Sequence, residues 1–107
     1  MYNISNLAKL KHLDENASDA MKAFWSFDKA AFAPGAIDVL NKQLIAVAVA
    51  LTTQCPYCIE LHTQSARKEG ARDEMLQKQR SSLRQCVLVV RSHMRLISSK
   101  SSSRRGR

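Results

Sequence analysis

Two cysteines and a histidine stand at a spacing that suits thiol chemistry, in Cys55-Pro56-Tyr57-Cys58 followed by His62. Proline at this point favours the first turn of a helix, which would place the thiols near unpaired backbone N–H groups and the positive end of the helix dipole. Both effects favour the thiolate, the form that attacks an electrophile. His62 lies one turn beyond Cys58 on the same face, where it can accept or return a proton. The second thiol can close a disulfide once the first is oxidised to a sulfenic acid.

Two other interpretations of the cysteines stay open. They could form half of a zinc site, with His62 as a third ligand and Cys86 or His93 as a fourth, although no second closely spaced pair of ligands follows. They could also be inert packing residues. The redox dithiol is the leading hypothesis, and it requires neither a metal nor a bound cofactor.

Two further polar residues are weaker candidates for a site. His12 lies in the N-terminal segment, and we expect it at the surface. Glu60 falls on a different helix face from Cys58, so we expect it to be solvated or to lie in an interface. Neither is assigned a chemical role.

The motif lies within a series of predicted helices. Leucines at helical spacing predict a helix from about residue 7 to 13. A second helix would begin at the N-cap Ser18 and end before Pro34-Gly35. Its stripe of apolar residues is interpreted as core packing; the stripe contains Met21, Phe24, Trp25 and Phe32.

The third predicted helix covers Ile37 to Thr53, with Asp38 early in its first turn. Its centre, LIAVAVAL, is apolar on every side, which is typical of a helix that is buried or sandwiched between subunits. The fourth begins near Pro56 and stops at Gly70, and Asp73 could cap a fifth. No strand pattern occurs in the first 76 residues, so the predicted fold class is all-α.

The basic charge of the chain is concentrated in its last third. Seventeen Lys and Arg against nine Asp and Glu give a net charge of +8, but every acid lies within residues 1–76 and nine basic residues lie within 77–107. We therefore divide the chain into a domain of residues 1–76 and a basic, serine-rich, partly disordered tail of residues 77–107. The tail contains no aromatic residue for base stacking, so it predicts only nonspecific attraction to nucleic acid.

Several other protein classes are disfavoured. The longest apolar run has eight residues, against about 20 for a membrane span, and predicts no membrane partner. No secretory signal pattern is visible, and three cysteines do not form the disulfide framework of a small secreted domain. The predicted location is the cytoplasm.

The segment LIAVAVALTTQCPYCIELHTQSARKEGA resembles the signature of the carboxymuconolactone decarboxylase-like superfamily. The redox branch, typified by the alkyl hydroperoxide reductase D proteins (alkylhydroperoxidases), is the closer match because it carries C-x-x-C-x-x-x-H. Residues 2–37 also resemble small peroxidase-like members, so the resemblance covers about residues 2–76. It implies a helical bundle, a homo-oligomer (trimer or hexamer), a hydroperoxide substrate and a dithiol reductant protein. It also implies that Cys58 is the peroxidatic thiol, Cys55 its resolving partner and His62 part of a proton relay.

The chain departs from the family pattern at two relay positions. A glutamate typical of the redox members is replaced by Gln43, whose amide can orient a neighbour but cannot take up a proton at neutral pH. Some redox members have a histidine where this chain has Tyr57. The relay would then depend on His62 alone, which predicts weakened activity. The alternative function is a non-catalytic, oligomeric interaction domain.

The tail is a third departure. Members of the family usually continue with an alanine-rich, apolar helix, which residues 77–100 do not resemble. A back-translation of these residues, read one nucleotide earlier, can give AEATFVVAAVRAGGAVTHAAHLFK, which has that character. We hypothesise a change of reading frame near Leu76.

Overall fold

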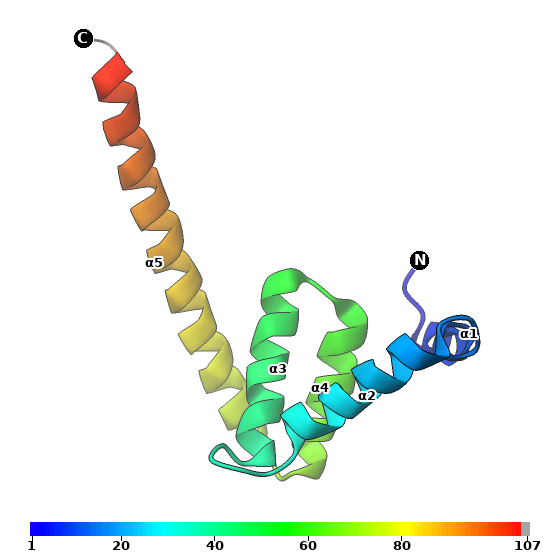
Figure 1. The fold of residues 1–107 in the computed structure, drawn as a ribbon. Helices are drawn as coiled ribbons and strands as arrows, with labels where there is room; N and C mark the ends of the chain where they lie inside the picture. The colour runs from blue at the N-terminus through cyan, green and yellow to red at the C-terminus, as the bar shows by residue number, and fades with distance from the viewer. Residues whose placement is uncertain (106–107) are drawn as a thin grey trace. The chain divides into compact units, whose positions relative to one another are not determined.

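The chain forms helices in two units, Met1–Arg72 and Asp73–Arg107. The structure is a computed structural model that describes the backbone of residues 1–105 and the side chains of residues 1–97. No strand occurs among the described residues, which confirms the predicted all-α fold. The helices, drawn in Figure 1, are the 3₁₀ helix η1 (Ile4–Leu10), α1 (Lys11–Asn16), α2 (Ser18–Phe32), α3 (Val39–Thr53), α4 (Pro56–Lys68) and α5 (Asp73–Arg105).

The start of α3 is set by a side-chain cap. Asp38 has an extended backbone, and its carboxylate accepts a hydrogen bond of 2.8 Å from the backbone N–H of Asn41. The helix therefore begins at Val39, two residues later than predicted, because Asp38 caps the helix from outside its first turn. At α2, by contrast, the residue that was predicted to cap the helix lies inside it. Ser18 is the first helical residue, and Ala17 before it makes no side-chain cap.

Helix α4 has the ends that the sequence predicted. Pro56 stands in its first turn, and Arg67 and Lys68 stand in its last turn, where cations are favoured. The chain leaves the helix through Gly70, whose φ of +99° lies in the region that glycine adopts without strain.

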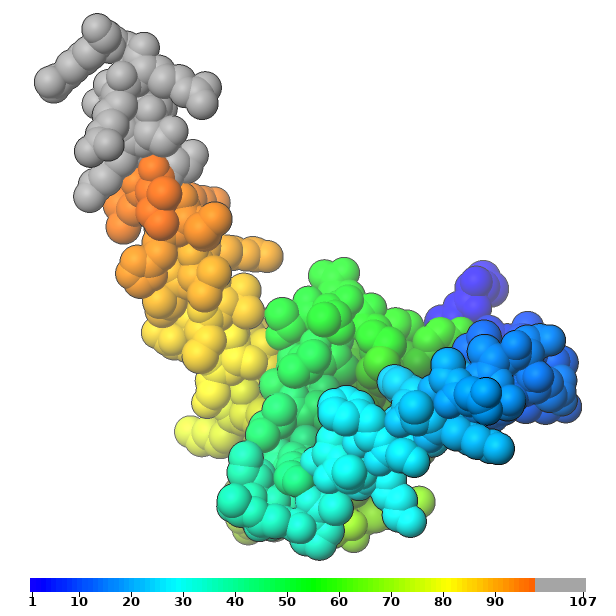
Figure 2. All heavy atoms as spheres, viewed as in Figure 1, coloured from blue at the N-terminus to red at the C-terminus, as the bar shows by residue number. Residues whose placement is uncertain are grey.

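Helices α3 and α4 form the central pair of the first unit (Figure 1). A short turn joins them, with Gln54 in the left-handed conformation (φ 59°). The C-terminal end of α2 lies against α3, as Figure 2 also shows, because Lys42 of α3 donates a hydrogen bond to the carbonyl of Ala31. Among the described side chains, the buried apolar residues are small and few; they are Val47, Ala50, Ala66 and Ala71.

The apolar centre of α3 is covered only in part within this chain. Val47 is 4% exposed, whereas Ile45 and Val49 are 53% and 56% exposed. The aromatic stripe of α2 is likewise not a core. Phe24 packs edge-on against Trp25, with ring centroids 5.0 Å apart, and both side chains are exposed. The interpretation of this stripe as core packing was wrong for these two residues, because α2 contacts α3 mainly through its last turn.

The second unit consists of α5, which begins at Asp73. Asp73 and Glu74 lie in its first turn, where carboxylates suit the dipole. The tail of residues 77–107 was predicted to be partly disordered; its backbone is helical to Arg105, and residues 106–107 lie outside the described residues. The domain boundary at residue 76 stays a prediction, as does the change of reading frame. None of the described helices has the length and apolar character needed to cross a membrane.

Candidate active site

The two cysteines of the motif form a disulfide at the start of α4, with their Cα atoms 5.3 Å apart. Cys55 is the N-cap residue, and its Sγ accepts a hydrogen bond of 3.3 Å from the backbone N–H of Cys58. That N–H group is one of the unpaired donors at a helix start. In the reduced protein, the same donor would stabilise a thiolate on Cys55.

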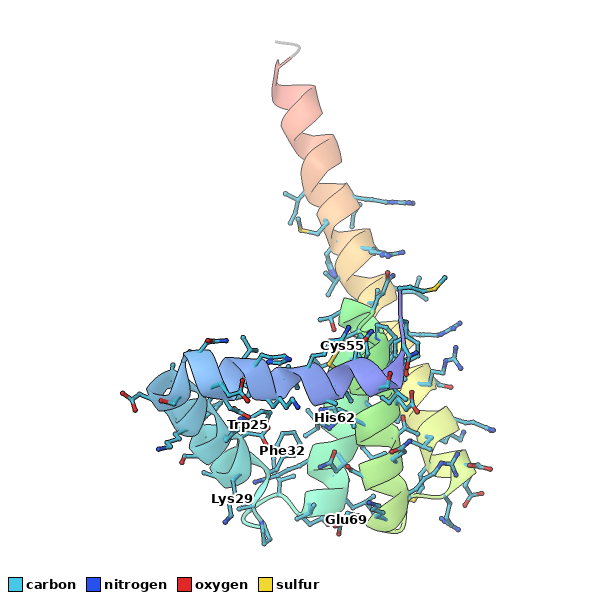
Figure 3. The ribbon with its side chains drawn as sticks, turned by 90° about the vertical axis from the view of Figure 1, so that its right-hand side faces the viewer. Trp25, Lys29, Phe32, Cys55, His62 and Glu69 are labelled. Atoms are coloured by element: carbon cyan, nitrogen blue, oxygen red, sulfur yellow. A yellow bond between two sulfur atoms is a disulfide. The ribbon has the colours of Figure 1, made fainter. Side chains whose placement is uncertain are left out.

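His62 lies one turn beyond Cys58 and is held by two neighbours. Its Nδ1 is 2.8 Å from Oε1 of Gln43 on α3, and its ring stacks on Phe32 of α2 at a centroid distance of 5.4 Å. Figure 3 shows Phe32 next to His62, with Cys55 further along towards the start of α4. Because an amide oxygen only accepts hydrogen bonds, Nδ1 must carry the proton. The other ring nitrogen, Nε2, is then left as an acceptor.

The surroundings of His62 favour the neutral form of its ring. Partial burial lowers the pKa of His62 below its ordinary value of 6.5, and the negative charge of Asp28 opposes this shift in part. A neutral imidazole with a bare Nε2 is the form that can take a proton from a thiol.

A pocket of about 410 Å³ lies beside these residues. Its walls are almost entirely apolar and come from α2, α3 and α4. The lining residues are Ala31, Phe32, Lys42, Ile45, Ala46, Val49, Ala50, Thr53, Cys58 and His62. Cys58, one half of the disulfide, and the candidate base His62 therefore line the same cavity, whereas Cys55 does not line it.

Tyr57 contacts the N-terminal segment and does not line this pocket. Its Oη accepts hydrogen bonds from the Asn6 side chain at 3.0 Å and from the Asn3 backbone N–H at 3.3 Å. These two bonds lower the pKa of Tyr57, and the bond from Asn6 has the larger effect. Tyr2 packs on the Tyr57 ring at 4.7 Å and donates a hydrogen bond to Glu60. That bond raises the pKa of Tyr2 to about 12.

Replacement of Tyr57 by phenylalanine tests this attachment of the N-terminal segment. Tyr57→Phe keeps a ring against Tyr2 but removes the oxygen that accepts the Asn3 and Asn6 bonds. We expect the Asn3 amide to exchange its hydrogen about 2- to 10-fold faster, the factor that corresponds to one ordinary hydrogen bond. Amide hydrogen exchange measured by NMR would show this, with the Ala50 amide of α3 as the internal control. Unchanged exchange at Asn3 would show that the hydroxyl does not hold the segment.

The other polar candidates of the sequence lie outside the pocket. His12 is exposed and lies 3.5 Å from Glu15. Glu60, expected to be solvated or in an interface, accepts hydrogen bonds from Tyr2 and Gln64. The zinc hypothesis has no geometric support, because no three His, Cys, Asp or Glu side chains of the described part of the chain gather as metal ligands.

Two residues of the pocket were missed by sequence reasoning. Phe32 was assigned to the core, but its ring instead stacks on the ring of His62. Lys42 was not singled out. A signal for it existed, because Lys42 is the only charged residue between Asp38 and Glu60.

Comparison with known proteins identifies the chain. The sequence model of the carboxymuconolactone decarboxylase family matches residues 18–95. The chain belongs to this family. The match includes the whole pocket and extends beyond residue 76 into α5. Membership confirms the resemblance at the level of the superfamily.

Two similar proteins show how far the family likeness reaches. The crystal structure of an apo carboxymuconolactone decarboxylase family protein from Legionella pneumophila is 34% identical, with a TM-score of 0.68, over 72% of this chain and 69% of that protein. The uncharacterized protein 4 in the cox locus of Paracoccus denitrificans is 57% identical over 54 residues. This alignment spans about half of either protein, 50% of this chain and 49% of the relative.

Proposed function

We propose that this member of the carboxymuconolactone decarboxylase family is a thiol-dependent hydroperoxidase of the alkyl hydroperoxide reductase D type. The supporting observation is that Cys58 and His62 line one apolar pocket while Cys55 is in disulfide contact with Cys58. A decarboxylase has no need of a dithiol at its pocket. A hydroperoxidase needs an attacking thiol, a resolving thiol within reach and a proton carrier.

In the proposed reaction, Nε2 of His62 takes the proton of the Cys58 thiol, and the thiolate attacks the terminal oxygen of the hydroperoxide. The O–O bond breaks, and the alkoxide leaves as an alcohol with the proton that His62 returns. Cys58 is then a sulfenic acid. The Cys55 thiol attacks its sulfur, a disulfide forms and water leaves. An external dithiol protein reduces the disulfide and becomes oxidised itself.

The apolar lining of the pocket favours this chemistry for an organic hydroperoxide. Apolar walls exclude water around the reacting sulfur and accept an organic group by the hydrophobic effect. We place the cycle in the cytoplasm, where dithiol donors are maintained. We also propose that the active form is a homo-oligomer, trimer or hexamer, because Ile45 and Val49 of the pocket wall are more than half exposed in one chain.

Stoichiometry tests the proposed function. We expect one equivalent of an organic hydroperoxide, added to the fully reduced protein, to remove two thiols and to yield one equivalent of the corresponding alcohol. Thiol titration and peptide mass spectrometry would locate the new bond between Cys55 and Cys58. No alcohol formation would contradict the proposal. It would favour the second candidate, a non-catalytic interaction domain, for which the replacement of a glutamate by Gln43 is the specific observation.

A further inference from the structure

Among the described residues that line the pocket, Lys42 has the only charged side chain, apart from the titratable groups Cys58 and His62. It lies on α3, one residue before Gln43, which contacts His62. Its neighbours in the wall are alanines, a phenylalanine, a valine and an isoleucine. Lys42 is only partly buried, so it adds an accessible positive charge to an otherwise apolar wall.

The chain itself engages only part of the ammonium group of Lys42. The ammonium group donates hydrogen bonds to the backbone carbonyls of Ala31 and Ala33 at the end of α2, at 2.8 and 2.5 Å. These bonds occupy two of its three N–H donors. Within the described residues no carboxylate lies within ion-pair distance of Lys42. Asp28 acts electrostatically on His62 but makes no ion pair with Lys42. One donor and a full positive charge therefore stay accessible, to water or to an anionic ligand.

The position of Lys42 also fixes where such a ligand would carry its negative charge. Lys42 and Thr53 both line the pocket, eleven residues apart on α3, so the wall extends for about 16 Å. Gln43, the residue after Lys42, contacts His62, so Lys42 lies towards the end of the pocket that His62 lines. Cys58 lies one turn of α4 away from His62. A molecule that presents one end to Cys58 and the other to Lys42 would span roughly one to two helical turns of apolar wall.

We propose that Lys42 determines substrate specificity by binding the carboxylate of an amphipathic organic hydroperoxide. The hydroperoxy group would lie at Cys58, the hydrocarbon body along the apolar residues of α3, and the carboxylate at the Lys42 ammonium. This inference rests on the proposed function, and it narrows the substrates to hydroperoxides that carry an acid group.

The test compares a hydroperoxy carboxylic acid with its methyl ester, which differ chiefly in the negative charge. In the wild-type protein we expect kcat/KM for the acid to exceed that for the ester about 5- to 10-fold, mainly through KM, and to lose this advantage at high salt. We expect Lys42→Gln to bring the ratio close to one and Lys42→Arg to retain it. Lys29→Gln is the matched control, because Lys29 lies on α2 outside the pocket lining.

A binding measurement separates this inference from the proposed function. The hydroxy acid that forms as product, and its methyl ester, require no catalysis and can be compared by calorimetry. Tighter binding of the hydroxy acid in the wild type, lost in Lys42→Gln, supports the inference even if no hydroperoxide is consumed. Equal affinity for acid and ester in the wild type, or a preference that persists in Lys42→Gln, would overturn it. If Lys42→Gln also loosens the end of α2, the comparison of acid with ester in the wild-type protein still tests the inference, because it uses no variant.

Discussion

Replacement of Cys58 by serine should reduce hydroperoxide consumption to the rate measured without protein, a loss on the order of 10³-fold or more. A serine hydroxyl remains protonated at neutral pH, so residue 58 would no longer present a nucleophile to the pocket. Consumption would be measured with a dithiol donor in excess and an organic hydroperoxide, in parallel with a circular dichroism spectrum to verify the helices.

The chain offers a matched control for this replacement. Cys86 is exposed, makes no disulfide and lies on α5 outside the pocket lining. Cys86→Ser should leave the rate unchanged, which would show that removal of a thiol as such has no effect. If Cys58→Ser kept the wild-type rate, the assignment of Cys58 as the attacking thiol would be wrong.

The role of Cys55 is distinguished by a different result. In Cys55→Ser, Cys58 should still react once and then stay as a sulfenic acid, because the thiol that closes the disulfide is gone. One equivalent of alcohol per chain, followed by arrest, is the expected outcome, and a sulfenic acid reagent would label Cys58. Continued turnover with a dithiol donor would mean that the donor attacks the sulfenic acid directly.

Local sequence signals predicted the parts of the site that depend on neighbouring residues. Pro56 and Gly70 bound α4 because their backbone preferences act within one turn, and the four-residue spacing of Cys58 and His62 follows from helix geometry. The same local rules misplaced the start of α3, because a carboxylate at position 38 can occupy the first turn or cap it, and only the backbone dihedral angles distinguish the two.

The contacts that complete the site join residues far apart in the sequence, and these were not predictable. Gln43 was recognised as a substituted relay position, but its bond to His62 requires α3 to pack against α4 at one particular register. The same holds for the stacking of Phe32 on His62 and for the contacts of Tyr57 with residues 2–6. Both depend on how separate helices pack against one another. Periodicity shows that a helix has an apolar face without showing which helix covers it.

The histidine of the site should control the acid limb of the pH profile. The neutral form of His62 is the base, so activity should be full above its pKa and should fall as the pH drops through that value, which lies below 6.5. His62→Phe keeps a ring on Phe32 but has no base, and we expect a loss of about 10²- to 10⁴-fold. His93→Phe, on the exposed surface of α5, is the matched control.

Gln43→Glu should shift that limb in a defined direction. A carboxylate at 2.8 Å from Nδ1 favours the imidazolium, so it should raise the pKa of His62, by about one pH unit or more. The acid limb of kcat/KM would move to higher pH by the same amount, while a stronger base would speed proton removal above it. The pH dependence of thiol alkylation, measured in both proteins, separates this shift from a change in the thiolate of Cys58. An acid limb that stays in place in Gln43→Glu would mean that His62 does not govern it and that the Gln43 contact only positions the ring.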